Sequence, residues 1–190
     1  MKLGGEYLGD DKLAGLGFRR LGRDVRIHSL ASLYGLENIS IGDHVRIDDF
    51  AVIIATGPVV IGNYVHIANF CYLGATQGIT LEDFSGLSPG VMIFTSSDDY
   101  SGTRLTNPTV PKKYTGGRAG QVILGKHVIL GARSVVLPQC HLGEGCSVGA
   151  MSLVNRDLEP WGVYSGIPAR RMKERKKDLL ELERQLKAEP

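Results

Sequence analysis

Aliphatic residues recur every six positions along most of this chain, and nearly all the positions between them are polar or small. The repeat stops after residue 93 and resumes in step at residue 124. Every position of the series is Leu, Ile or Val: Leu21, Ile27, Leu33, Ile41, Ile47, Ile53, Ile61, Ile67, Leu73, Leu81, Leu87, Ile93, Leu124, Leu130, Val136, Leu142, Val148 and Val154.

A period of six matches neither the 3.6-residue period of an amphipathic helix nor the alternation of a simple strand. It matches a coil with three flat faces, each made of a short strand and a corner. The step lengthens to eight at 33–41, 53–61 and 73–81, so each early coil takes twenty residues. Stacked coils of this kind hydrogen-bond as parallel strands and bury each other's faces. The pattern therefore predicts an all-β solenoid, a parallel β-helix.

Two segments interrupt the pattern, and they divide the chain. Residues 94–121 are polar and rich in Gly, Pro, Ser and Thr, which predicts a long loop excursion from the coil; such loops are usually functional. Residues 169–188 predict a charged C-terminal helix that caps the open end of the solenoid. We expect an N-terminal cap over 1–20, the β-helix over 21–154, and a terminal turn and helix over 155–190.

Composition narrows the class of protein. The length of 190 residues fits one domain, and a net charge of +2 does not favour a nucleic-acid partner. No signal peptide and no membrane span are expected from the sequence, so we expect a cytoplasmic protein. The three cysteines lack metal-type spacing and are interpreted as buried apolar residues, Cys71, Cys140 and Cys146.

The hexads, such as Ile-Gly-Asn-Tyr-Val-His at 61–66, and the ending Ser-Gly-Ile-Pro-Ala-Arg at 165–170 resemble the hexapeptide-repeat acyltransferases. The similarity covers about residues 21–173 and is greatest to the galactoside and maltose acetyltransferases and to the nucleotide-amino-sugar N-acetyltransferases. This resemblance implies a left-handed coil, acetyl-CoA as co-substrate, and a homotrimer with its active sites between subunits.

The resemblance also assigns residues to CoA. Small corner residues would let the pantetheine arm lie along the coil, and cations near the tail would face the nucleotide phosphates. The alternative is that the tail cations form only a solvated face. The expected CoA residues are Gly131, Ala132, Gly149, Ala150, Asn155, Arg156, Ile167, Pro168, Arg170 and Lys173.

The family's catalytic histidine falls here on Asp98, in a loop segment, 96–102, that contains no histidine. A carboxylate is a poor base for a sugar hydroxyl, but it is adequate for holding an ammonium group or for accepting a proton after an amine has attacked. This favours N-acetylation of a nucleotide-linked amino sugar, and the resemblance implies that the product serves surface polysaccharide synthesis. Asp99 is a second candidate, because adjacent carboxylates disfavour each other's ionisation. The bland alternative is that both residues serve only the turn.

His66 is the other candidate base, with Asp98 orienting its ring as in a His–Asp pair. A solvent-facing histidine without a role is the alternative. The family's acceptor-pocket asparagine falls on Ala68, beside Asn69. The expected acceptor contacts are Asn69, Tyr72, Asp48, Asp49 and Tyr100.

Three other functions compete with this interpretation. The first is O-acetylation of a sugar or polysaccharide hydroxyl. The second is a zinc carbonic anhydrase of the same coil architecture, but the chain lacks that enzyme's histidine pair five residues apart, so no metal is expected. The third is a non-catalytic scaffold, which the CoA-type ending argues against.

Overall fold

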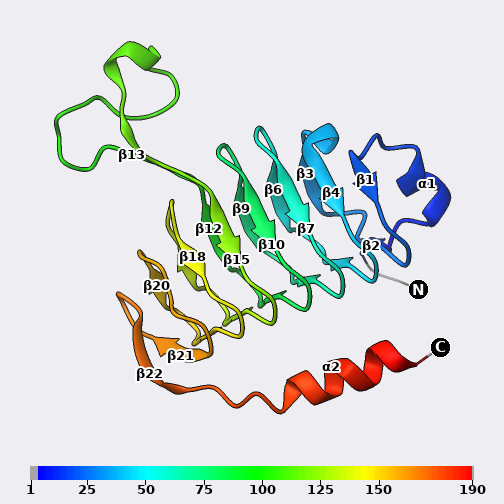
Figure 1. The fold of residues 1–190 in the computed structure, drawn as a ribbon. Helices are drawn as coiled ribbons and strands as arrows, with labels where there is room; N and C mark the ends of the chain where they lie inside the picture. Colours follow the sequence, from blue (N-terminus) through cyan, green and yellow to red (C-terminus); the bar gives the residue numbers. More distant parts are fainter. Residues whose placement is uncertain (1–3, 190) are drawn as a thin grey trace.

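A computed structural model describes residues 4–189 and shows a triangular solenoid of three parallel sheets (Figure 1). The first sheet holds β1 (Arg20–Leu21), β4 (Ile39–Ile41), β7 (Val59–Ile61), β10 (Ile79–Leu81), β15 (Val122–Leu124) and β18 (His141–Leu142). The second holds β2 (Arg26–Ile27), β5 (Arg46–Ile47), β8 (His66–Ile67), β11 (Gly86–Leu87), β16 (Ile129–Leu130), β19 (Ser147–Val148), β21 (Gly162–Ser165) and β22 (Arg170–Glu174). The third holds β3 (Ser32–Tyr34), β6 (Val52–Ile54), β9 (Tyr72–Gly74), β12 (Met92–Phe94), β17 (Val135–Val136) and β20 (Leu153–Val154).

The repeated aliphatics stack directly over one another, as predicted. Ile41 is the register partner of Ile61, and Ile61 is that of Leu81. All three side chains are almost completely buried. Burying one such side chain stabilises the fold by about 1.5–3 kcal/mol, so each coil contributes to a continuous apolar core.

The corner between the first and second sheets carries a stack of rings on left-handed backbone. His44, Tyr64, Phe84 and His127 have φ between 56° and 60°. Such a conformation costs roughly 1–2 kcal/mol for a residue with a Cβ. Successive rings lie 4.6, 4.8 and 5.1 Å apart between centroids and are nearly parallel, and this stacking offsets part of the cost. We call this row the aromatic corner.

The predicted loop leaves the coil after β12 and returns just before β15 (Figure 1). Its base is a two-stranded antiparallel ribbon, β13 (Ser96–Asp98) and β14 (Gly117–Ala119). At the root, the Gly120 N–H donates to the Thr95 carbonyl at 2.9 Å. Leu81 still pairs with Leu124 across the excursion, so the loop leaves the register of the coil intact.

The C-terminal segment differs from the prediction of a helix over 169–188. Its first part is strand β22, antiparallel to β21, so the second sheet continues beyond the expected boundary at 154. Only α2 (Leu179–Ala188) is helical. It lies along the side of the solenoid and does not cap its end (Figure 1), with Lys177 over Trp161 and Lys187 over Phe84 of the aromatic corner.

The remaining short elements cover the N-terminal coils and the loop. They are α1 (Asp10–Ala14) and two single 3₁₀ turns, Leu36–Asn38 and Lys112–Tyr114. Leu13 of α1 is buried in the core, so this helix packs against the first coils. None of the helices within residues 4–189 is both long enough and apolar enough to cross a membrane.

Candidate active site

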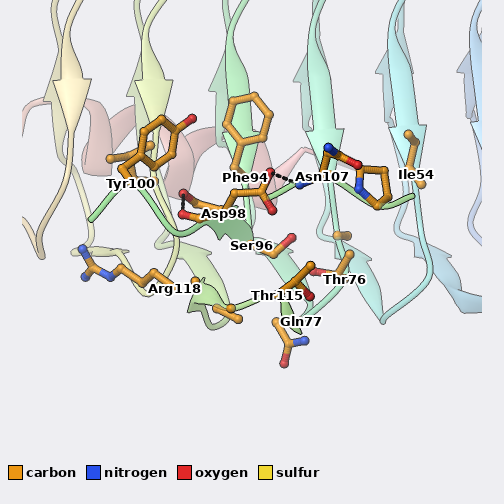
Figure 2. Close-up of a pocket in the computed structure, with 18 of the residues that line it drawn as sticks. Ile54, Thr76, Gln77, Phe94, Ser96, Asp98, Tyr100, Asn107, Thr115 and Arg118 are labelled. Carbon is orange, nitrogen blue, oxygen red and sulfur yellow. Dashed lines mark hydrogen bonds between the residues drawn. The ribbon is translucent and has the colours of Figure 1, made fainter. Parts of the chain in front are cut away.

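A hollow of about 940 Å³ lies between the third sheet and the excursion loop (Figure 2). The sheet contributes a mainly apolar wall and the loop contributes most of the polar groups. Its lining includes Ile54, Tyr72, Phe94, Asp98, Tyr100, Asn107 and Arg118. We call this hollow the loop groove.

Asp98 stands at the end of β13, exposed and facing the loop groove. Its position is fixed by the ribbon, where it pairs with Gly117. Gly117 has φ of 147°, and a Cβ there would collide with the backbone of Ser97 and Asp98, so glycine is needed for this close approach. The Asp98 carboxylate accepts one long hydrogen bond, from the Asn107 N–H at 3.3 Å, and no other donor within residues 4–189 occupies its oxygens.

Asp99 is hydrogen-bonded within the loop, and these bonds disfavour the expected role as a base. Its carboxylate accepts hydrogen bonds from the Ser101 hydroxyl and N–H, the Thr103 hydroxyl and the Arg104 N–H. These bonds, led by that from the Ser101 hydroxyl, hold the pKa of Asp99 well below its ordinary value. The group therefore stays ionised and fully occupied at neutral pH.

His66 pairs with Asp48, and not with Asp98 as predicted. Nε2 of His66 lies 2.8 Å from Oδ2 of Asp48. His66 lies on the second sheet, whereas Asp98 follows the third, so within one chain Asp98 does not orient the imidazole ring. Asp48 also accepts hydrogen bonds from Arg46 Nε at 2.6 Å and from the Tyr7 hydroxyl at 2.7 Å.

The expected acceptor contacts fall into two groups. Tyr72 and Tyr100 line the loop groove; Tyr72 packs against Phe94 with ring centroids 5.3 Å apart, and Tyr100 is 93% exposed. Asp48, Asp49 and Asn69 lie at the corner between the second and third sheets, outside the residues that line that groove. The structure thus brings Tyr72 together with Asp98, and Asp48 together with His66.

The predicted pantetheine residues lie on the same corner between the second and third sheets. The Gly131 N–H donates to Val148 O at 2.8 Å, and the Gly149 N–H donates to Tyr164 O at 2.8 Å, so the two corners stack on successive coils. A Cβ on Gly131 would lie 2.4 Å from the Ala150 nitrogen. Glycine is therefore required at this position by the close spacing of the coils, whether or not CoA is bound.

The tail residues expected to meet the nucleotide of CoA surround the last coil. Arg170 pairs with Ser165 across β21 and β22, and Lys173 pairs with Val163. Both cations are exposed, as are Ile167 and Arg156, while Pro168 and Asn155 are half-buried. Their neighbour Arg175 is half-buried instead, and donates from Nη1 to the carbonyls of His127 and Gly145.

Sequence reasoning missed Tyr7 and Arg46 as partners of Asp48. A signal for Arg46 was present, because the twenty-residue coil places Arg46 beside His66 on neighbouring strands. Tyr7 gave no such signal, since it precedes the repeat and joins the coil through an isolated bridge to His28.

Comparison with known proteins supports one class. The family model for the bacterial transferase hexapeptide (six repeats) matches residues 121–156. The chain is 44% identical over 178 residues to an Escherichia coli dTDP-4-amino-4,6-dideoxy-D-glucose acyltransferase, covering 93% of each sequence. It is 41% identical to AntD, an N-acyltransferase from Bacillus cereus solved with dTDP and 3-hydroxybutyryl-CoA, with a TM-score of 0.92 and coverage of 95% and 96%.

A more distant neighbour shares only the fold. Perosamine N-acetyltransferase from Caulobacter crescentus, solved with CoA and GDP-perosamine, is 21% identical, with a TM-score of 0.59 and coverage of 79% of this chain and 57% of that one.

The chain belongs to the hexapeptide-repeat acyltransferases, which use an acyl-CoA as the donor. Within that family it is an acyltransferase of the branch that acts on nucleotide-linked amino sugars.

Proposed function

We propose that the protein transfers an acyl group from acyl-CoA to the 4-amino group of a dTDP-linked 4-amino-4,6-dideoxy sugar. The similar Escherichia coli enzyme is named for this acceptor, and AntD has been solved with dTDP-4-amino-4,6-dideoxyglucose and CoA. The chain matches both over nearly its whole length.

The observation that carries the proposal is the exposed Asp98 carboxylate in the loop groove. No histidine is found among the described residues that line this groove. The charged groups that face the acceptor there are the Asp98 carboxylate and cations such as Arg118. Variants of AntD have been solved at a serine and at an aspartate ten positions after it. Ser88 and Asp98 have the same separation here.

The chemistry matches an amine acceptor. A sugar amine is mainly protonated at neutral pH, and a carboxylate binds the ammonium. The neutral fraction, which has released one proton to solvent, attacks the thioester carbonyl, a C–N bond forms, and a tetrahedral oxyanion with a positively charged nitrogen develops. Asp98 accepts a proton from that nitrogen, the C–S bond breaks, and the proton passes to the CoA thiolate as the amide is released. Asp98 needs only to hold and accept a proton, which an ordinary carboxylate does.

We further propose that the working unit is a homotrimer whose active sites lie between subunits. Within one chain, the corner between the second and third sheets that carries Gly131, the CoA corner, and the loop groove that carries Asp98 lie on different parts of the solenoid. A neighbouring chain that brings its loop to the CoA corner would complete the site. Size-exclusion chromatography with light scattering tests this, and a monomer with full activity would contradict it.

A reaction assay tests the function. The purified protein is incubated with dTDP-4-amino-4,6-dideoxyglucose and either acetyl-CoA or 3-hydroxybutyryl-CoA, and free thiol is followed. We expect thiol release with at least one donor, and none with dTDP-glucose, which carries a hydroxyl at C4. Absence of thiol release from the amino sugar with either donor would overturn the proposal.

The product distinguishes this proposal from O-acylation. Mass spectrometry before and after mild base separates an ester, which is cleaved, from an amide, which survives. We place the reaction in the cytoplasm, where acyl-CoA is made, and its product among the precursors of surface polysaccharides.

A further inference from the structure

We propose that Arg26, Arg46 and His66 form the subsite for the diphosphate of the acceptor nucleotide. This inference rests on the proposed function, since it names where that function's sugar nucleotide is held. We call the three residues the cationic row.

The cationic row follows from the register of the coil. Arg26 is the partner of Arg46, and Arg46 is the partner of His66, on β2, β5 and β8 of the second sheet. Each stands next to a buried isoleucine, so all three side chains point outward from the same face. Neighbouring strands are about 4.8 Å apart, a spacing that lets adjacent side chains contact successive phosphates.

Asp48 holds two members of the row, Arg46 and His66, in place. It is only 9% exposed, and it receives Arg46 through both Nε and Nη2, at 2.6 and 3.3 Å, and lies 2.8 Å from the ring of His66. Burial alone would raise the pKa of Asp48, but hydrogen bonds from Arg46, Tyr7 and His66 outweigh it and lower that pKa. An ionised, hydrogen-bonded carboxylate thus fixes the side chains of Arg46 and His66 before any ligand arrives, which reduces the ordering cost of binding.

The outer side of the row remains available. Arg46 uses Nε and Nη2 on Asp48, and among residues 4–189 its Nη1 donates to no protein group. Arg26 is 64% exposed and has a loose contact of 3.6 Å with Asp24. The next position in the row is Gly86, where a Cβ would meet no atom within 4 Å, so open space continues beside His66.

The position of the cationic row along the solenoid favours the acceptor nucleotide, and not CoA, as its ligand. Asp48, Ala68, Ser88, Gly131 and Gly149 occupy the same corner position on successive coils, each linked by its N–H to the next coil. The expected CoA residues take the C-terminal coils of this corner. The cationic row flanks its N-terminal coils.

If CoA lies along the C-terminal coils of this corner and the acceptor along its N-terminal coils, their reacting ends meet at the middle of the corner. Ser88 is that middle position, one coil from Gly131 and one from Ala68. Cations at the far end then face the diphosphate, which leaves the sugar directed toward the thioester.

The test is calorimetric titration of dTDP and, separately, of CoA into the full-length protein. We expect Arg26→Gln and Arg46→Gln each to weaken dTDP binding about tenfold or more, with CoA affinity unchanged, and added salt to weaken dTDP binding to the wild type. Arg23→Gln is the matched control. It removes an exposed arginine that pairs with Asp43 at a different corner, and we expect it to change neither affinity.

The outcomes of these titrations separate the subsite from the proposed function. Unchanged dTDP affinity in both row variants overturns the subsite while leaving the proposed function intact. Loss of CoA affinity in Arg26→Gln assigns the row to CoA and likewise overturns the subsite. Failure of the wild type to bind dTDP overturns both proposals. Arg26→Gln decides the question alone if Arg46→Gln does not fold, because Arg26 makes no contact with Asp48.

Discussion

Glu183 of α2 lies 2.7 Å from Nε2 of His127, a ring of the aromatic corner, and both side chains are almost completely buried. The same carboxylate also receives Lys187 at 2.6 Å and Lys126 at 3.0 Å. The hydrogen bond from Lys187, with those from Lys126 and His127, lowers the pKa of Glu183 from its ordinary 4.5 to about 2. The helix is therefore fastened to the coil by one ionised carboxylate.

This contact predicts a pH dependence of stability. Because the pKa of Glu183 is lower in the folded state, its contribution is fully present above about pH 4.5 and is lost as the pH falls toward 2. Urea unfolding of the wild type and of Glu183→Gln should differ clearly at about pH 6 and should converge at about pH 2. Glu181→Gln, on the same helix but paired with exposed Arg184, should match the wild type throughout. Equal stability of Glu183→Gln at pH 6 would contradict the role of this pair.

The core predicts a sharp contrast within one strand. Ile61 and Val60 are neighbours on β7, yet Ile61 is buried at 2% exposure and Val60 points outward. Ile61→Ala should lower the free energy of unfolding by about 2–5 kcal/mol, because it leaves a cavity between stacked aliphatics. Val60→Ala should change it by about 0.5 kcal/mol or less. Similar losses for the two variants in urea titration would argue against the stacked core.

Asp98→Asn should lower kcat about 100-fold or more, because the amide keeps the hydrogen bond to Asn107 but neither accepts a proton nor attracts an ammonium. Its thermal midpoint and CoA affinity should match the wild type. Asp99→Asn should behave differently and raise KM for the acceptor, because it loosens the loop that Ser101, Thr103 and Arg104 hold in place. Steady-state kinetics measure both. Full activity of Asp98→Asn would exclude the carboxylate as proton acceptor.

Arg170→Ala should weaken CoA binding by about 1.5–3 kcal/mol if its guanidinium meets a phosphate. Arg171 is the matched control, since it follows on the same strand and is already paired with Glu174 at 2.6 Å. Arg171→Ala should leave CoA affinity within error of the wild type. Calorimetry that finds equal affinities for all three proteins would make Arg170 a surface cation only.

The six-residue period was enough to predict the three sheets and the stacking of Ile41 on Ile61. Each repeated aliphatic residue marks the core-facing position of its own strand, and a shift by one residue would turn all of these side chains toward solvent. The tail was less predictable. Residues 170–174 have charges that suit a helix, but they pair with the open edge of β21. This tertiary pairing outweighs their local helix propensity, so the segment is a strand.

The site was predicted in part. The resemblance to the family, together with the hexad count, pointed to Asp98; the structure places this residue in a groove, and its catalytic role stays a prediction. The pairing of His66 with Asp48 did not follow, because the hexads give the face of a residue but not the rotamer of a long side chain. His127 and Glu183 were missed for a different reason. Their contact depends on the path of α2 back along the coil, which no local pattern records.

The excursion loop begins and ends at adjacent points, joined at Thr95 and Gly120, while Leu81 and Leu124 pair as though nothing lay between them. Its length and composition are thus free to vary without any penalty to the scaffold. Exchange of this one insert should therefore change the groove without disturbing the coil, and the loop is where grafting should first be tried to redirect the enzyme to another sugar.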